Sequence, residues 1–126
     1  MSSTNTTAAQ PLLEMIAADE RALLRTGEVA RELLALHADL PLTGVRLKYG
    51  GEILLNAPAA EDVRAWAERL RSEITEHTDD PGYGSGSVFQ HTSTESVIEG
   101  VRVHVWHCRI LADAEAAAWR KSGGRP

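Results

Sequence analysis

Apolar and polar residues alternate most regularly near the end of the chain, over residues 97–110. This stretch is rich in β-branched and aromatic residues, which fit a pleated sheet. Glu99-Gly100 interrupts the alternation and is typical of a tight hairpin turn. We therefore predict a hairpin of two strands, 88–98 and 101–110. The first strand is polar, which favours a place at the edge of a sheet.

The same alternation occurs earlier in the chain, on both sides of Gly50-Gly51. Residues 45–49 alternate Val, Leu and Tyr with Arg and Lys, and Ile53 and Leu55 alternate after the glycines. A double glycine between two such runs predicts a second hairpin. Its polar face is expected to contact solvent and carries Arg46, Lys48 and Glu52.

Helical spacing marks residues 11–37, where one apolar stripe recurs at intervals of three and four residues. The stripe consists of Leu13, Ile16, Leu23, Ala30 and Leu34. Gly27 weakens a helix interior by about 1 kcal/mol relative to Ala, so one long helix and two shorter helices both remain open. A continuous helix would be about 40 Å long, and such an overhang is typical of self-association.

Two further helices are predicted. The first follows Pro58 and places Val63, Trp66 and Ile74 on one apolar stripe. The second covers the alanine-rich residues 111–121. Between them, residues 77–87 contain a Pro-Gly turn and a Gly-Ser loop, which lacks the Lys-Ser/Thr of a phosphate-binding loop.

These elements predict an α+β fold in the order α-ββ-α-ββ-α. We expect a four-stranded antiparallel sheet with helices packed mainly on one face. Residues 11–121 are expected to form a single domain, preceded by a disordered tail, 1–10, and followed by a frayed C-terminus, 122–126.

Composition narrows the possible classes of protein. The formal net charge of −5 argues against a nucleic-acid binder, which usually presents a basic surface. The single cysteine, Cys108, excludes an intrachain disulfide. No window approaches the roughly 20 apolar residues that a membrane span requires. We therefore expect a cytoplasmic protein with no membrane partner.

Candidate contact residues lie on one face of the hairpin that closes at Glu99-Gly100. This turn places Arg102, His104 and Trp106 beside Phe89 of the neighbouring strand. If that face meets solvent, these residues form an aromatic patch of the kind that marks contact surfaces. If residues 111–119 fold back over the face, Trp106 is a core residue. Both alternatives remain open.

The same face holds His91, His104 and Cys108, whose side chains are all possible zinc ligands. However, His104 and Cys108 lie about 13 Å apart along a strand, too far to share one ion. Catalysis by Cys108 would require a nearby base, for which only His91 is placed, and an oxyanion hole, for which no residues are evident. We therefore expect no catalytic residues, no metal site and no cofactor.

Three segments together resemble a family of proteins. They are Leu33–Pro41, Val63–Ala67 and Glu99–Trp106, which includes the strand Gly-Val-Arg-Val-His-Val-Trp. The ensemble, within residues 30–108, resembles small uncharacterised accessory proteins of actinomycetes (actinobacteria) and of their phages and integrative elements. The resemblance implies such an origin and an auxiliary role, and it assigns no activity and no catalytic residue.

The sequence therefore favours a non-enzymatic protein-interaction or regulatory accessory module that binds another protein and forms a homodimer. The first alternative is a nucleic-acid-associated regulator, because Arg64, Arg69 and Arg71 share one predicted helix and Arg102 and Arg109 share one strand. The second alternative is a small metal protein or enzyme that uses His91, His104 and Cys108.

Overall fold

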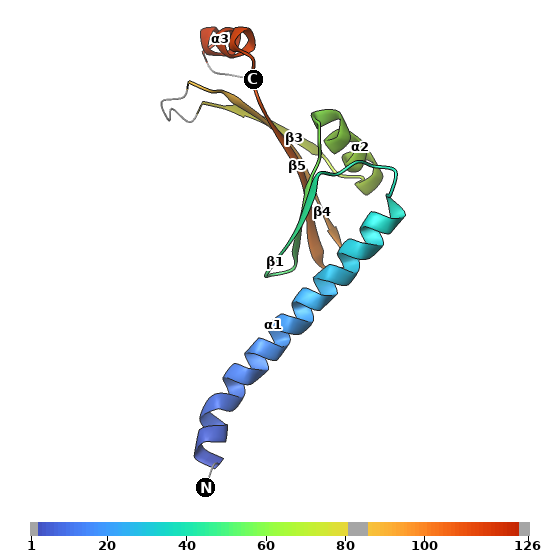
Figure 1. Cartoon of the computed structure of the whole chain (residues 1–126), viewed down its shortest axis with the longest axis vertical. Coiled ribbons are helices and arrows are strands. Elements are labelled where there is room, and N and C mark those ends of the chain that lie inside the picture. Colours follow the sequence, from blue (N-terminus) through green and yellow to red (C-terminus); the bar gives the residue numbers. More distant parts are fainter. Residues whose placement is uncertain (1–2, 81–85, 124–126) are drawn as a thin grey trace.

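The computed structural model describes residues 3–80 and 86–123, with side chains from residue 9 onward. Its elements, shown in Figure 1, are α1 (Ser3–Leu36), β1 (Gly44–Lys48), β2 (Glu52–Asn56), α2 (Ala60–Leu70), β3 (Ile74–Asp79), β4 (Phe89–Ile98), β5 (Val101–Ile110) and α3 (Asp113–Lys121). The strands form one five-stranded sheet in the order β1-β2-β5-β4-β3. The α+β class is thus confirmed.

The prediction of a four-stranded antiparallel sheet is wrong in two respects. β3 is an additional strand, formed by residues that we assigned to the end of a helix and to a loop. β2 and β5 pair in parallel, whereas the other neighbouring strands are antiparallel. The parallel pair is possible because α2, β3 and β4 separate β2 from β5 in the chain and supply the long connection that it requires.

The polar strand β4 is not at an edge of the sheet, contrary to our prediction. It lies between β5 and β3. Thr92 and Thr94 of β4 are buried, and the Thr94 hydroxyl donates a hydrogen bond of 2.8 Å to the Glu73 carbonyl. A polar strand is stable in the interior because this partner satisfies the buried Thr94 hydroxyl.

The pairing predicted for the later hairpin is confirmed. Ile98 lies opposite Val101, and Glu95 lies opposite His104. Both turn residues have positive φ, 50° at Glu99 and 80° at Gly100, as a type I′ hairpin turn requires. In the earlier hairpin, Lys48 lies opposite Glu52, so the loop has one residue more than the two glycines that we predicted.

α1 is a single continuous helix, which resolves the choice between one helix and two. It begins at Ser3, so the described part of the expected disordered tail, residues 3–10, is helical instead. Extending an existing helix costs much less than starting a new one, which explains why Pro11 and Gly27 do not end it. At 1.5 Å per residue α1 is about 51 Å long.

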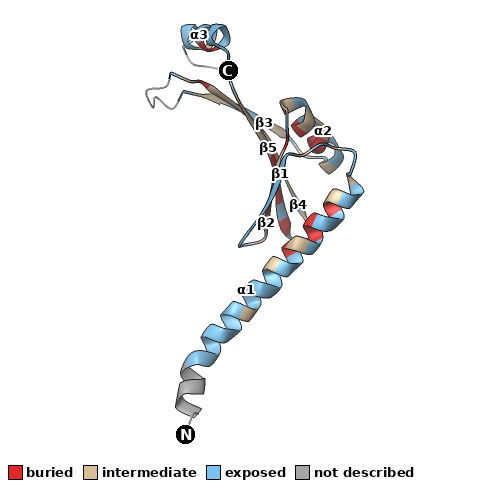
Figure 2. Cartoon of the chain, viewed as in Figure 1, coloured by how far each residue is buried: buried red, intermediate tan, exposed pale blue. Residues whose placement is uncertain are grey.

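The core lies between one face of the sheet and the two helices α1 and α2. Figure 2 shows that α1 is buried only in its C-terminal part, where Thr26, Val29, Ala30 and Leu33 are buried. Trp66 of α2 packs in the same core. The core residues of the sheet come from its central strands: Ile53, Leu55, Val101, Val103 and Val105. The expectation that the helices pack mainly on one face therefore holds for α1 and α2.

α3 lies beyond the end of the sheet and does not fold back over it (Figure 1). Its residues Ala116 and Trp119 form a separate small cluster with Val88 and Leu111. Arg109 of β5 pairs with Glu115 of α3 at 2.9 Å, which ties the helix to the strand. The predicted Pro-Gly dipeptide and the first half of the predicted Gly-Ser loop fall on residues 81–85, outside the described residues. No helix in the described part of the chain is long and apolar enough to cross a membrane.

Candidate interaction surfaces

One face of the sheet carries no helix among the described elements (Figure 1), and we call it the open face. Successive side chains of a strand point to opposite faces of the sheet. The core valines of β5 point toward the helices, so the residues between these valines point to the open face. Arg102, His104 and Trp106 of β5 lie there, together with Phe89 of β4. The four residues that we predicted as an interaction surface thus share one face, but Phe89 pairs with Ile110 and lies four residues along the strands from the position of Trp106.

The environment of Trp106 settles whether it belongs to the core. Trp106 is half-buried, and α3 does not cover it. Two surface hollows flank its side chain. The first, of about 230 Å³, is lined by residues including Arg46 and Leu54. The second, of about 440 Å³, is lined by residues including Pro58 and Cys108. Trp106 is therefore a partly exposed aromatic anchor between two hollows.

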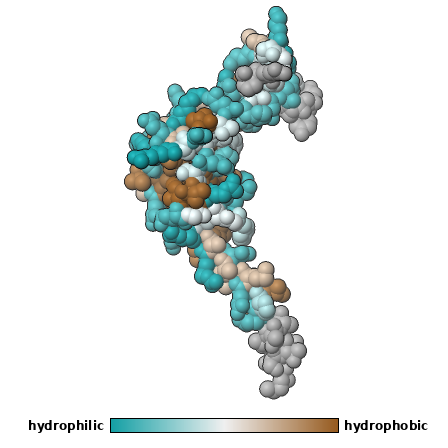
Figure 3. All heavy atoms as spheres, turned by 180° about the vertical axis from the view of Figure 1, so that it is seen from behind, coloured by the Kyte–Doolittle hydropathy of each residue, from teal (hydrophilic) through white to brown (hydrophobic). Residues whose placement is uncertain are grey.

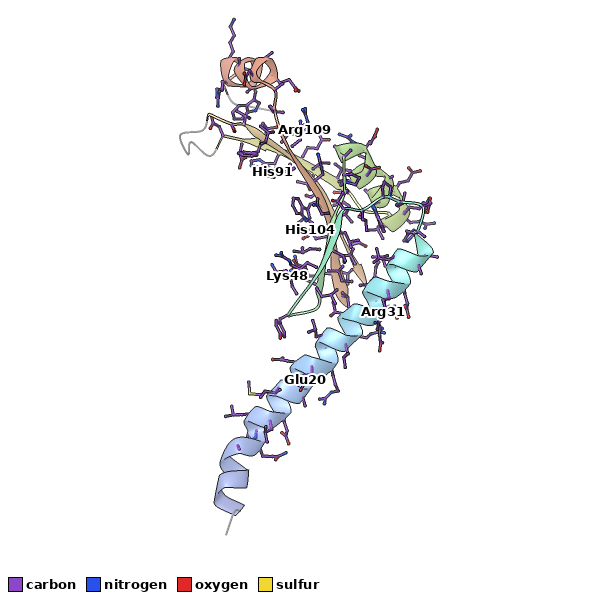
Figure 4. The ribbon with its side chains drawn as sticks, in the orientation of Figure 1. Glu20, Arg31, Lys48, His91, His104 and Arg109 are labelled. Atoms are coloured by element: carbon purple, nitrogen blue, oxygen red, sulfur yellow. The ribbon has the colours of Figure 1, made fainter. Side chains whose placement is uncertain are left out.

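Charged groups at the other end of the open face are paired with one another. The Arg102 guanidinium lies 3.3 Å from Glu52 and 3.2 Å from Glu95, so it bridges β2 and β4 across β5. His104, which is labelled on the sheet in Figure 4, lies directly opposite Glu95 in the strand register. The open face therefore combines a half-buried tryptophan with paired charged side chains, and an apolar centre with a polar rim is typical of contact surfaces.

The candidate zinc ligands do not converge. His91 lies directly opposite Cys108, but His104 is four residues away along β5 and pairs with Glu95 instead. In the part of the chain that the structure describes, no group of three or more His, Cys, Asp or Glu side chains could hold a metal ion.

Two neighbours of His91 were missed from the sequence because residues 77–79 were assigned to a turn. His77 lies opposite His91, with ring centroids 5.8 Å apart, and the His91 Nε2 atom lies 3.2 Å from an Asp79 carboxylate oxygen. The β-branched residues Ile74, Thr75 and Thr78 were the available signal for this strand. Burial, and then the charge of Asp79, raise the pKa of the Cys108 thiol. Such a thiol is a poor nucleophile at neutral pH.

The projecting half of α1, residues 9–24, is the most apolar exposed surface that the structure describes in α1. Leu12 (61 %), Met15 (63 %), Ile16 (56 %) and Leu24 (65 %) are exposed, and Leu13 is exposed beside them. Figure 3, seen from behind, shows hydrophobic residues on this part of the helix as well as on the body of the molecule. In Figure 2 the same segment is almost entirely exposed.

A groove lies where the projecting half meets the sheet. It has a volume of about 390 Å³ and is lined by Leu23, Leu24 and Gly27 of α1 and by Leu47 of β1. Glu20 and Arg31 line it as well, one on each side of Gly27 along the helix. Leu47 lies opposite the buried Ile53, so it points to the same face as the core although no described helix covers it fully. The groove is thus an apolar extension of the core surface.

The arginines that suggested nucleic-acid contacts are largely engaged with carboxylates. Arg64 pairs with Glu76, and Arg69 forms a two-pronged contact with Asp39. Arg102 and Arg109 are paired as described above, and Arg71 is exposed. The Arg69 contact lowers the pKa of Asp39. Arginines neutralised in this way contribute little to a phosphate-binding surface, which weighs against the nucleic-acid alternative.

Comparison with known proteins adds no relative. No protein-family model matches the chain, and no curated protein and no solved structure is significantly similar to it. What the protein does must therefore be inferred from the geometry of its own surfaces.

Proposed function

We propose that the protein is a non-enzymatic interaction module that self-associates through α1 and binds a further protein at the open face. One observation carries this proposal: the projecting half of α1 exposes apolar side chains in the single chain. We call these residues the apolar stripe of the projecting half: Leu12, Leu13, Met15, Ile16 and Leu24. An isolated helix of about 16 residues is marginal in water, so the segment gains stability when a second helix covers it. Twofold dimers are the commonest soluble homo-oligomers.

Sedimentation velocity on two matched variants tests self-association. Ile16→Glu places a charge on the apolar stripe, and Ala18→Glu places the same charge on the exposed opposite side of the helix. We expect a dimer for the wild-type protein and for Ala18→Glu, and a monomer for Ile16→Glu. A wild-type monomer at all concentrations would refute self-association.

The open face is the proposed site for the other partner. Trp106 is the proposed anchor, because tryptophan is enriched among the residues that contribute most of the binding energy in protein interfaces. Trp106→Ala is expected to abolish capture of the proteins that the wild-type chain retains. Tyr49→Ala, an exposed aromatic in the β1–β2 turn, serves as control and is expected to retain them. Unchanged capture by a folded Trp106→Ala variant would exclude this surface.

A further inference from the structure

The groove between α1 and β1 is open in the single chain, and its lining indicates what covers it. Leu23, Leu24 and Leu47 form its apolar walls, and Gly27 forms part of the floor. Because glycine has no side chain, Leu47 of the same chain packs close to the backbone of α1 here: a Cβ atom at Gly27 would lie 3.5 Å from the Leu47 Cδ1 atom. An amphipathic helix is the natural occupant of such a groove.

The chain's own projecting half cannot occupy its own groove. α1 is one continuous helix that runs straight away from the sheet (Figure 1), and Leu23, Leu24 and Gly27 of the groove belong to that same helix. Residues 12–16 therefore cannot fold back onto it. A second copy of the chain can place the same residues there.

Charge determines which way the second helix runs. Residues 9–20 contain three acidic residues, Glu14, Asp19 and Glu20, and no basic residue. The groove has Glu20 toward its N-terminal end and Arg31 toward its C-terminal end (Figure 4). A parallel partner would place its acidic segment beside the acidic segment of the first copy. An antiparallel partner places it toward Arg31, and it also aligns the two helix dipoles favourably.

We propose that the projecting half of α1 from a second copy lies antiparallel in this groove, with Ile16 of each copy close to Gly27 of the other. This inference rests on the proposed self-association and adds where and in which direction the two copies meet. The contact is isologous, so each copy gives its helix and receives the other's. Leu47 of β1 becomes part of the dimer interface.

The orientation is tested by measuring the distance between two spin labels in the dimer. Gln10 is exposed and lies away from the apolar stripe, so Gln10→Cys in a Cys108→Ser background carries one label per chain. With Ile16 opposite Gly27, the antiparallel arrangement separates the labels by about 35 Å. A parallel arrangement brings them to within about 20 Å, which would overturn the proposal.

The place of the second helix is tested with charge substitutions on the sheet. Leu47→Glu is expected to weaken the dimer at least tenfold in sedimentation equilibrium. Ile110→Glu changes an exposed apolar residue of β5 that lies far from the groove, and it is expected to leave the dimer unchanged. Circular dichroism shows whether each variant is folded. If Leu47→Glu is unfolded, the distance between the two spin labels tests the proposal instead.

The outcomes separate this inference from the function on which it rests. Loss of the dimer in Ile16→Glu but not in a folded Leu47→Glu would overturn the groove and retain self-association through α1. A short label distance would do the same. A monomeric wild-type protein would overturn both.

Discussion

Trp66 shows how much one residue contributes to this small core. It is fully buried and packs against the core strands, and His37 makes an edge-on ring contact with it at 5.2 Å. Among the described residues, its indole Nε1–H finds no hydrogen-bond acceptor. A buried donor without a partner reduces stability by about 1–3 kcal/mol. The side chain therefore stabilises the fold through its size and not through its polar group.

Trp66→Ala is expected to lower the free energy of unfolding by about 3–5 kcal/mol, because it leaves a large cavity. Trp66→Phe is expected to lower it by only about 1–2 kcal/mol, since phenylalanine fills most of the space and removes the unpaired N–H. Urea denaturation of the three proteins measures the difference. Equal losses in the two variants would show that the indole N–H has a partner in solution.

Arg71 ends α2 in the left-handed conformation, with φ of 54° and ψ of 46°. The Ser72 amide donates to the Ala67 carbonyl and the Arg71 amide to the Glu68 carbonyl, which is the Schellman arrangement that usually has glycine at this position. Arg71→Gly is therefore expected to leave stability unchanged or to raise it by up to about 1 kcal/mol. Thermal denaturation checks this. Arg69→Gly, inside the same helix, is the control and is expected to destabilise.

Cys108 is expected to react slowly with iodoacetamide at pH 7.5, because burial and the charge of Asp79 raise its thiol pKa. Asp79→Asn removes the second of these causes. The thiol pKa then falls, and alkylation at a fixed pH becomes modestly faster. Asp39→Asn, which changes a carboxylate elsewhere on the surface, should leave the rate unchanged. A plot of alkylation rate against pH gives the pKa in each variant.

At the element scale, surface charges help to hold α3 against the sheet. Arg109 lowers the pKa of the Glu115 carboxyl below its ordinary value of 4.5. Because the folded-state pKa is depressed, the pair stabilises the docked helix fully above about pH 4.5. That contribution is lost as the pH falls through the lower folded-state value.

The expected result is that α3 loosens on acidification below pH 4.5. The indole resonance of Trp119, which packs in the α3 cluster, reports this in NMR spectra. In Glu115→Gln the resonance is expected to be shifted already at neutral pH and to change less on acidification. Glu61→Gln, in the first turn of α2, is the control and should behave like the wild-type protein.

The elements also show which sequence signals were sufficient. The turn at Glu99-Gly100 was predicted with its pairing, because the alternation on both sides is regular and a tight turn fixes which residues face one another. β3 was missed because it is mostly polar and its exposed residues do not produce a clear two-residue period. Ile74 fitted the helical stripe of α2 equally well, and only the left-handed Arg71 ends the helix before it.

At the scale of the whole molecule, the two parts of α1 differ in what stabilises them. Residues 26–36 pack on the sheet, whereas residues 12–22 depend on a second copy in our proposal. Ile16→Glu is expected to speed amide hydrogen exchange at least tenfold in residues 12–22. Exchange in residues 26–36 should change little. Mass spectrometry of peptides from the two regions measures both, and equal protection in wild type and variant would contradict a stabilising contact at the stripe.

Self-association also links stability to concentration. Because a dimer forms only from folded chains, the thermal midpoint of the wild-type protein is expected to rise with protein concentration. The midpoint of Ile16→Glu is expected to stay constant over the same range, and that of Ala18→Glu to follow the wild type. Differential scanning fluorimetry over a hundredfold range of concentration is sufficient to detect the trend.

By itself, the sequence determined the local structure and which side chains lie on the same face of a helix or of the sheet. Alternation and turn chemistry predicted both hairpins, helical spacing predicted α2 and most of α1, and the four contact candidates lie on one face as expected. These features depend on neighbours in the chain, which a sequence pattern records directly. Tertiary structure decided the parallel pairing of β2 with β5, the interior place of β4 and the half-buried state of Trp106. It also decided that Leu47 and Gly27 line one groove. Each of these depends on contacts between residues far apart in the chain, whose free energies no local pattern contains.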